Sequence, residues 1–150
     1  MKIHKNSAWT EAQIIDYLSK TNVPIRLACN DKNGYPSICS LWFIYLDGAL
    51  WSASHKSAHI IKLLKSDSKI SFEVATNDYP YHGVRGKADA TLISDASGNV
   101  LGQLIDKYLQ NGNKPLSDWL LSRKQDEYAI KIAPLSINAW DFSHRMQKDS

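Results

Sequence analysis

The chain has 150 residues, of which 43% are hydrophobic and 22% are charged, and its formal net charge is +3. This composition excludes an intrinsically disordered chain and fits one domain with a buried core. Lysine and arginine are scattered without a basic run, no stretch approaches a membrane-spanning length, and the start of the chain has no apolar signal core. We therefore expect a cytoplasmic protein with neither a nucleic-acid nor a membrane partner.

The first third of the chain predicts one helix followed by strands in tight hairpins. Thr10 and Gln13 have the spacing of a capping box, which predicts a helix that ends near Lys20. Apolar and β-branched runs then predict three strands, at residues 25–30, 37–46 and 49–54. The turns between these strands contain residues that favour positive φ, in Asn33-Gly34 and Asp47-Gly48.

The remainder of the chain alternates helices with strands. Ser57 is a candidate N-cap for a short helix with an apolar side formed by Ile60, Ile61, Leu63 and Leu64. Strands are predicted at residues 69–76 and 83–93, helices at 100–109 and 116–123, and extended segments at 128–132 and 137–142. Pro134 is expected to end the first of the last two segments and so to separate it from the second.

This order of elements favours a mainly β fold. The turns between the first three strands are too short for the crossovers that parallel strands require. We therefore predict an antiparallel β-barrel with peripheral helices, formed by a single domain over residues 1–150. The polar ends, residues 1–8 and 143–150, are expected to be flexible.

No recognised catalytic motif is present: the sequence lacks a Gly-x-Ser-x-Gly elbow, a His-Glu-x-x-His pair, a Walker loop and a dinucleotide-binding glycine pattern. Cys29 and Cys39 have no zinc-ligand spacing, so no metal site is predicted. Such a protein either binds a ligand or uses a cofactor that brings its own chemistry.

The segment after the third strand combines groups that bind anions. Ser52 and Ser54 share one face of that strand. Lys56 lies in the next turn, and Ser57 and His59 begin a helix whose N-terminus carries partial positive charge. These groups favour a phosphate site. The alternative is that Ser57 only caps the helix, while the lysine and the histidine are solvated at the surface.

Four aromatic residues on predicted strands are candidates either for the core or for a ligand platform: Trp42, Phe43, Trp51 and Trp140. A strand-borne tryptophan beside a phosphate site would suit a flavin, because flat aromatic ligands are stabilised by stacking and apolar walls. The same aromatics could stack on single-stranded nucleic acid, but they stand in apolar runs without interleaved lysine or arginine.

An ordered set of short motifs resembles the pyridoxamine 5′-phosphate oxidase-like superfamily of flavin-binding split β-barrels. The matching segments are Asn33-Gly34-Tyr35-Pro36-Ser37, Leu41-Trp42-Phe43, Leu50-Trp51-Ser52-Ala53-Ser54, Lys56-Ser57, Leu63-Leu64, Lys69-Ile70-Ser71-Phe72, Val84-Arg85-Gly86-Lys87-Ala88, Ile132-Ala133-Pro134 and Trp140-Asp141. Each is weak alone, but together they cover about residues 9–142.

This resemblance implies a split-barrel homodimer that binds FMN at two sites on the subunit interface. The residues that it implies for the cofactor are Ser40, Leu41, Trp42, Ser52, Ala53, Ser54, Lys56, Ser57, His59, Lys62 and Trp140. The strand at residues 40–42 would follow the isoalloxazine ring, and the turn after residue 54 would approach the ribityl chain and phosphate. Trp140 would reach the flavin of the partner subunit.

One position departs from the family pattern. His59 stands where family members commonly carry a phosphate-binding lysine, and Lys56 or Lys62 is expected to compensate. The implied activity is that of a flavin-dependent oxidoreductase with an unknown small-molecule substrate. Pyridoxamine-phosphate oxidation itself is not expected. Deazaflavin and haem are alternative cofactors, and the candidate axial ligands for haem are His55, His59, His82 and His144.

Overall fold

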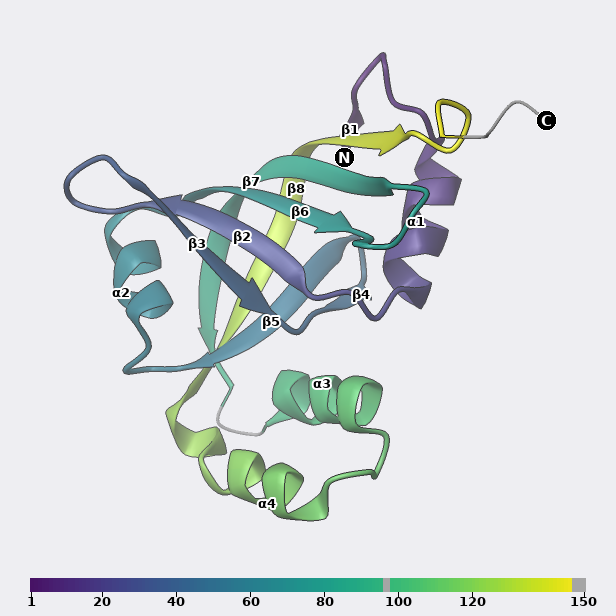
Figure 1. The fold of residues 1–150 in the computed structure, drawn as a ribbon. Coiled ribbons are helices and arrows are strands. Elements are labelled where there is room, and N and C mark those ends of the chain that lie inside the picture. Colours follow the sequence, from purple (N-terminus) through teal and green to yellow (C-terminus); the bar gives the residue numbers. More distant parts are fainter. Residues whose placement is uncertain (96–97, 147–150) are drawn as a thin grey trace.

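A computed structural model describes residues 1–95 and 98–146 (Figure 1). The strands of this part are β1 (Lys2–Ile3), β2 (Ile25–Asn30), β3 (Pro36–Leu41), β4 (Ile44–Leu46), β5 (Ala49–His55), β6 (Lys69–Ala75), β7 (His82–Ser94) and β8 (Glu127–Asp141). The helices are α1 (Glu11–Lys20), α2 (His59–Ser66), α3 (Asn99–Leu109) and α4 (Lys114–Ser122), with a 3₁₀ turn, η1 (Lys124–Asp126), before β8. The flexibility predicted for the tail falls partly on residues 147–150, which lie outside the described residues.

The described strands form one curled sheet in the order β3-β2-β6-β7-β8-β5-β4 (Figure 1). All neighbours in this order are antiparallel, and only the short β1 pairs in parallel, with β8. A mainly antiparallel barrel with helices at its periphery was the prediction from sequence, and it is confirmed.

The barrel core is filled from the sheet and from two helices at opposite ends of it (Figure 1). Ile14 and Leu18 of α1 and Ile61 of α2 have no exposed surface, and they join the same apolar cluster as Leu27 and Phe43. Burial of such side chains stabilises each helix by about 1.5–3 kcal/mol per residue relative to exposure. Both helices therefore close the ends of the barrel.

The strand predicted at residues 37–46 is in fact two strands. β3 pairs with β2 and β4 pairs with β5, so Trp42 and Phe43 carry the chain from one edge of the sheet to the other. Phe43 is fully buried in the core and anchors this break. The apolar run could not reveal the break, because residues on both sides of it have strand character.

β8 is continuous where the sequence predicted an interruption at Pro134. Lys87 of β7 pairs with Ser136, whereas Ala88 pairs with Pro134. Leu135 is therefore the extra residue of a β-bulge. A bulge tolerates a residue without a backbone N–H, so the proline shifts the register without ending the strand.

The prediction that Ser57 caps α2 is wrong. Ala58 is the N-cap and makes no side-chain hydrogen bond, while the Ser57 hydroxyl lies 2.7 Å from Nδ1 of His55. The capping box of α1 is confirmed, because Thr10 and Gln13 each accept the backbone N–H of the other.

Helices α3 and α4 form a hairpin that lies outside the barrel, beside β5 and the start of β8 (Figure 1). Val100 and Leu104 of α3 pack with Ala129 in a second, smaller apolar cluster that includes Trp42 and Trp51. The hairpin therefore covers the outer surface of the sheet next to the strand break. None of the helices in the described part of the chain is long and apolar enough to cross a membrane.

Candidate functional site

A pocket of about 320 Å³ lies between the end of β3, the end of β5 and the α3–α4 hairpin. One wall is formed by the end of β3 and the strand break, with Ser40, Leu41 and Trp42, and by β5, with Ala53, Ser54 and His55. The other wall consists of Leu101 and Leu104 of α3, Leu120 of α4, Arg123 directly after α4, and Glu127 at the start of β8. Because β3 is an edge strand of the sheet, the pocket lies at the split in the barrel.

Helix α3 fixes the strand break that forms one wall of the pocket. The ring of Tyr108 stacks on Trp42 at 5.1 Å between centroids and 4° between planes. The Tyr108 hydroxyl accepts the backbone N–H of Phe43 at 3.3 Å, and Nζ of Lys107 donates to the Phe43 carbonyl at 2.7 Å. Burial lowers the pKa of Lys107 to about 8. One face of Trp42 is thus covered by the protein, and its position is set by α3.

At the end of β5, His55 has a defined tautomer. The backbone N–H of Ser57 donates to Nδ1 of His55 at 3.2 Å, so Nδ1 carries no proton in the neutral ring. The Ser57 hydroxyl is the second group at this nitrogen, at 2.7 Å. The proton is therefore on Nε2, which lies 3.9 Å from Oδ2 of Asp126. Ser57 orients the histidine, and its own hydroxyl is engaged in doing so.

Lys56, predicted as a phosphate-binding cation, already has an acidic partner. Its Nζ lies 2.7 Å from Oδ1 of Asp126. This contact raises the pKa of Lys56 and lowers the pKa of Asp126. Both side chains are well exposed, so water screens the pair. A phosphate group at this turn would compete with Asp126 for the lysine.

Arg123 and Glu127 line the pocket but were missed by the sequence analysis. Glu127 is only 6% exposed, and burial raises the pKa of its carboxyl group, an effect that Arg123 opposes. The guanidinium of Arg123 lies 4.3 Å above the ring of Trp119. Glu127 reaches β5 through its pairing with His55, which no local sequence signal encodes.

The pocket gathers some of the predicted cofactor residues and leaves others outside. Those inside are Ser40, Leu41, Trp42, Ala53 and Ser54. Lys56 and Ser57 follow directly after the pocket residue His55, whereas His59 and Lys62 are exposed on α2 and do not line the pocket. The position at which the sequence departs from the family pattern is therefore outside this pocket.

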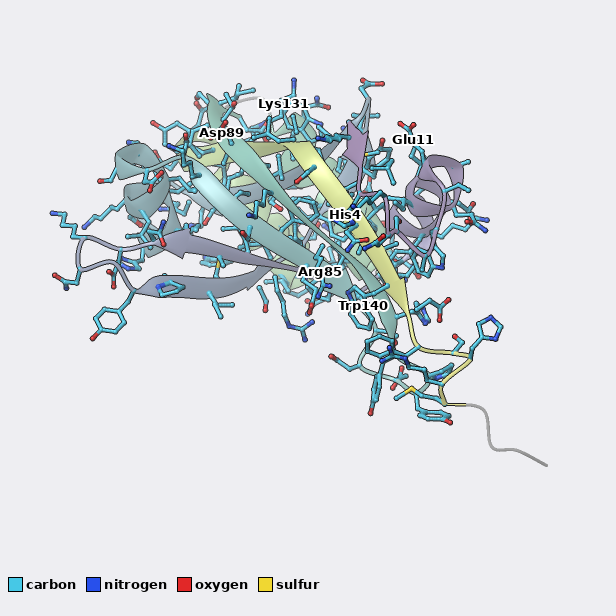
Figure 2. The ribbon with its side chains drawn as sticks, turned by 90° about the horizontal axis from the view of Figure 1, so that it is seen from above. His4, Glu11, Arg85, Asp89, Lys131 and Trp140 are labelled. Carbon is cyan, nitrogen blue, oxygen red and sulfur yellow. The ribbon has the colours of Figure 1, made fainter. Side chains whose placement is uncertain are left out.

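Two further predicted residues lie outside the pocket. Ser52 is fully buried, and its hydroxyl has no hydrogen-bond partner among the described residues. Trp140 pairs with Gly83 near the end of β8, at the opposite end of the strand from Lys131 (Figure 2). Its indole Nε1 is likewise buried and unpartnered in the described part of the chain. Within one chain, neither side chain lines the pocket.

A second hollow, of about 490 Å³, lies on the outer face of β2, β6, β7 and β8. Three charged residues lie side by side on neighbouring strands of this face: Arg26, Glu73 and Arg85. His4 and Lys87 also line the hollow, and Figure 2 labels His4 and Arg85. None of the predicted cofactor residues lines this hollow.

Comparison with known proteins settles the fold. No family model and no curated protein matches the sequence. A conserved hypothetical protein from Mycobacterium tuberculosis matches with a TM-score of 0.80 and 18% identity, over 100% of this chain and 96% of that one. An F420 reductase matches with a TM-score of 0.66 and 21% identity, over 82% and 94% of the two chains. The chain has the split β-barrel fold of these proteins.

Split-barrel proteins similar to this chain differ in their ligands. An FAD-binding protein from Mesorhizobium loti matches with a TM-score of 0.64 and 16% identity, over 87% of this chain and 92% of that one. HutZ, a haem storage protein from Vibrio cholerae, matches with a TM-score of 0.66 and 16% identity, over 87% and 93%. Identities this low establish the fold alone, so the ligand must be argued from the residues of the pocket.

Proposed function

We propose that this split barrel binds FMN in the pocket between β3 and β5 and acts as a flavin-dependent oxidoreductase on a small molecule. The observation that carries the proposal is the meeting of five residues in one pocket. These residues are the ones that the resemblance implied for the ring and the ribityl chain: Ser40, Leu41, Trp42, Ala53 and Ser54.

The chemistry of the pocket suits such a ligand. β3 is an edge strand, so the N–H and C=O groups on its outer side have no strand partner among the described residues and are available to the polar edge of a ring. Leu101, Leu104 and Leu120 supply apolar walls. Ser54 and Arg123 supply a hydroxyl group and a cation for a polar, anionic end. These features together match a flat heterocycle with a phosphorylated chain.

The protein would bind and orient the cofactor. A bound flavin would supply the redox chemistry itself. Trp42, held by Tyr108, would fix the position of the ring, and the leucines of the hairpin would exclude water from it. No acid or base of the chain is assigned to the reaction.

We propose further that a second copy of the chain completes the site. A pocket of about 320 Å³ is at the lower end of the range for ligands of drug-like size. The outer sheet face has alternating charges in Arg26, Glu73 and Arg85, and Ile38 at its rim is 71% exposed. Such a face suits a two-fold partner, because each acid can meet a base of the other copy.

A deazaflavin would use the same ring-binding groups and remains the nearest alternative. Haem is less well supported by the pocket. His55 is the one histidine of the pocket lining in the described residues, and a metal bound to Nε2 would require the proton on Nδ1. The Ser57 N–H points at that nitrogen. Haem binding through His55 would therefore break this contact.

The test is the visible spectrum of the purified protein, followed by titration with FMN. We expect either a bound flavin band or saturable binding of added FMN. Absence of both, with binding of the deazaflavin F420 or of haem in parallel titrations, would replace the proposal with the corresponding alternative. Absence of binding to all three would reject a cofactor role for the pocket.

A further inference from the structure

Arg123 differs from the other cations near the pocket. It is the one lysine or arginine that lines the pocket in residues 1–95 and 98–146. No acid lies within ion-pair distance of its guanidinium in this part of the chain. Its contact at 4.3 Å is with the face of Trp119, which leaves its N–H groups free to bind a ligand.

The cations predicted from the sequence are less suited to this role. Lys56 is held by Asp126 at 2.7 Å, and His59 and Lys62 do not line the pocket. An anionic group inside the pocket would thus meet Arg123 first. Its planar guanidinium can donate two parallel hydrogen bonds to a phosphate or a carboxylate, which a lysine cannot do.

We propose that Arg123 binds the anionic group of the ligand, so that the α3–α4 hairpin selects a phosphorylated ligand over its uncharged analogue. This inference rests on the proposed binding of a flavin in the pocket. It assigns the phosphate to a residue at the end of α4, in place of the turn after β5 that the resemblance implied.

The surroundings of Arg123 support this role. Its backbone N–H donates to the Leu120 carbonyl at 3.1 Å, which ties the residue to the last turn of α4. Ser40 and Ser54 lie in the same pocket and can add hydroxyl donors. The acids near the guanidinium are Asp126 and Glu127. Arg123 lowers the pKa of Asp126 and opposes the rise that burial causes in the pKa of Glu127. A bound phosphate would share the positive charge of Arg123 with these two acids.

FMN and riboflavin are the probes that test the inference, because they differ only in the phosphate group. Binding of each is measured by flavin fluorescence with the wild-type chain and with Arg123→Gln. We expect the wild type to prefer FMN over riboflavin by about tenfold or more. Arg123→Gln should lose most of this preference, with riboflavin affinity unchanged, and Arg123→Lys should keep part of it.

Two control variants separate local from general charge effects. Lys56→Gln removes a cation that is already paired and should reduce FMN affinity much less than Arg123→Gln. Lys114→Gln removes the exposed partner of Asp118 on the same helix and should change nothing. Unchanged riboflavin binding also shows that each variant is folded.

The outcomes of this experiment are distinct. If the wild type binds neither flavin, the proposed function fails and this inference fails with it. If the wild type prefers FMN and Arg123→Gln keeps that preference, the inference alone is overturned. Equal losses for FMN and riboflavin in Arg123→Gln would also overturn it, because they would indicate a structural role.

Discussion

Lys56 and Asp126 contact each other twice, through side chains and through the backbone. Nζ of Lys56 lies 2.7 Å from Oδ1 of Asp126, and the Lys56 N–H donates to the Asp126 carbonyl at 2.7 Å. The backbone bond joins the turn after β5 to η1, directly before β8. The side-chain pair places an acid of the protein where an anionic ligand would otherwise meet the lysine.

Asp126→Asn should therefore increase the affinity for FMN. The backbone bond remains, whereas Lys56 loses its charged partner and Arg123 loses a nearby acid, so more positive charge faces an anionic ligand. We expect FMN to bind severalfold more tightly and riboflavin to be unaffected, with little change in thermal stability because the pair is exposed. Asp118→Asn, which breaks the exposed pair with Lys114 on α4, is the matched control. Weaker FMN binding in Asp126→Asn would argue against competition between Asp126 and the phosphate.

Because of Lys107, the free energy of unfolding is expected to change with pH in the alkaline range. Its pKa is about 8 in the folded chain, because burial disfavours the charged form, against a model-peptide value of 10.5. Between these two values the unfolded chain binds more protons than the folded chain, so this residue makes stability rise with pH. Below about pH 8 the amine is charged in both states and its burial penalty is present in full.

The corresponding measurement compares unfolding midpoints of the wild type and Lys107→Met from pH 7.5 to pH 10.5. Tyrosine and cysteine residues also ionise in this range, but they are common to both proteins. We expect the midpoint of the wild type to rise relative to that of Lys107→Met as pH increases. A constant difference between the two would show that burial does not shift the pKa of Lys107.

Gly86 is required by the close packing of β6, β7 and β8. A Cβ at this position would lie 2.5 Å from the carbonyl oxygen of Ser136 and 2.7 Å from the ring of Phe72. We expect Gly86→Ala to destabilise the fold by about 2 kcal/mol, as overpacking in a core does. Gly102→Ala is the control: its Cβ would meet nothing within 4 Å on α3, so it should stabilise the helix by about 0.5–1 kcal/mol. Equal thermal stability of the two variants would contradict this assignment.

Ile38 should contribute to the proposed contact between two copies. It is 71% exposed on the edge strand β3 and lies at the rim of the charged outer hollow. Ile38→Glu should therefore shift the protein from dimer towards monomer in size-exclusion chromatography with light scattering. Leu46→Glu, at an exposed position on β4, should leave the dimer intact. A wild-type monomer at micromolar concentration would reject the second copy as part of the site.

The sequence predicted those elements whose signals are local. The capping box at Thr10 and Gln13 is read from four consecutive residues and gives the start of α1, and Asp47-Gly48 forms a hairpin turn with positive φ at both residues. The break at Trp42 and Phe43 was missed because it depends on which edge of the sheet each half joins. Pairing partners of this kind are set by the whole fold.

In the candidate site, too, some residues could be predicted from local sequence and others depend on the whole fold. Residues 40–42 and 53–54 were identified by resemblance and lie in one pocket. Arg123 had no signal beyond its place at the end of a predicted helix, because α4 is positioned by its packing on α3, which in turn packs on β5. Ser57 was predicted as a helix cap, but a nearby histidine competes for its hydroxyl group.

Equilibrium titration of FMN into flavin-free protein, followed by quenching of flavin fluorescence, tests the central proposal most directly. Trp42→Ala serves as the comparison, since it removes the ring that forms one wall of the pocket and is stacked on Tyr108. We predict saturable binding of one FMN per chain at micromolar or lower concentration and clearly weaker binding by Trp42→Ala. Unsaturable quenching, or equal affinities in the two proteins, would contradict a flavin site between β3 and β5.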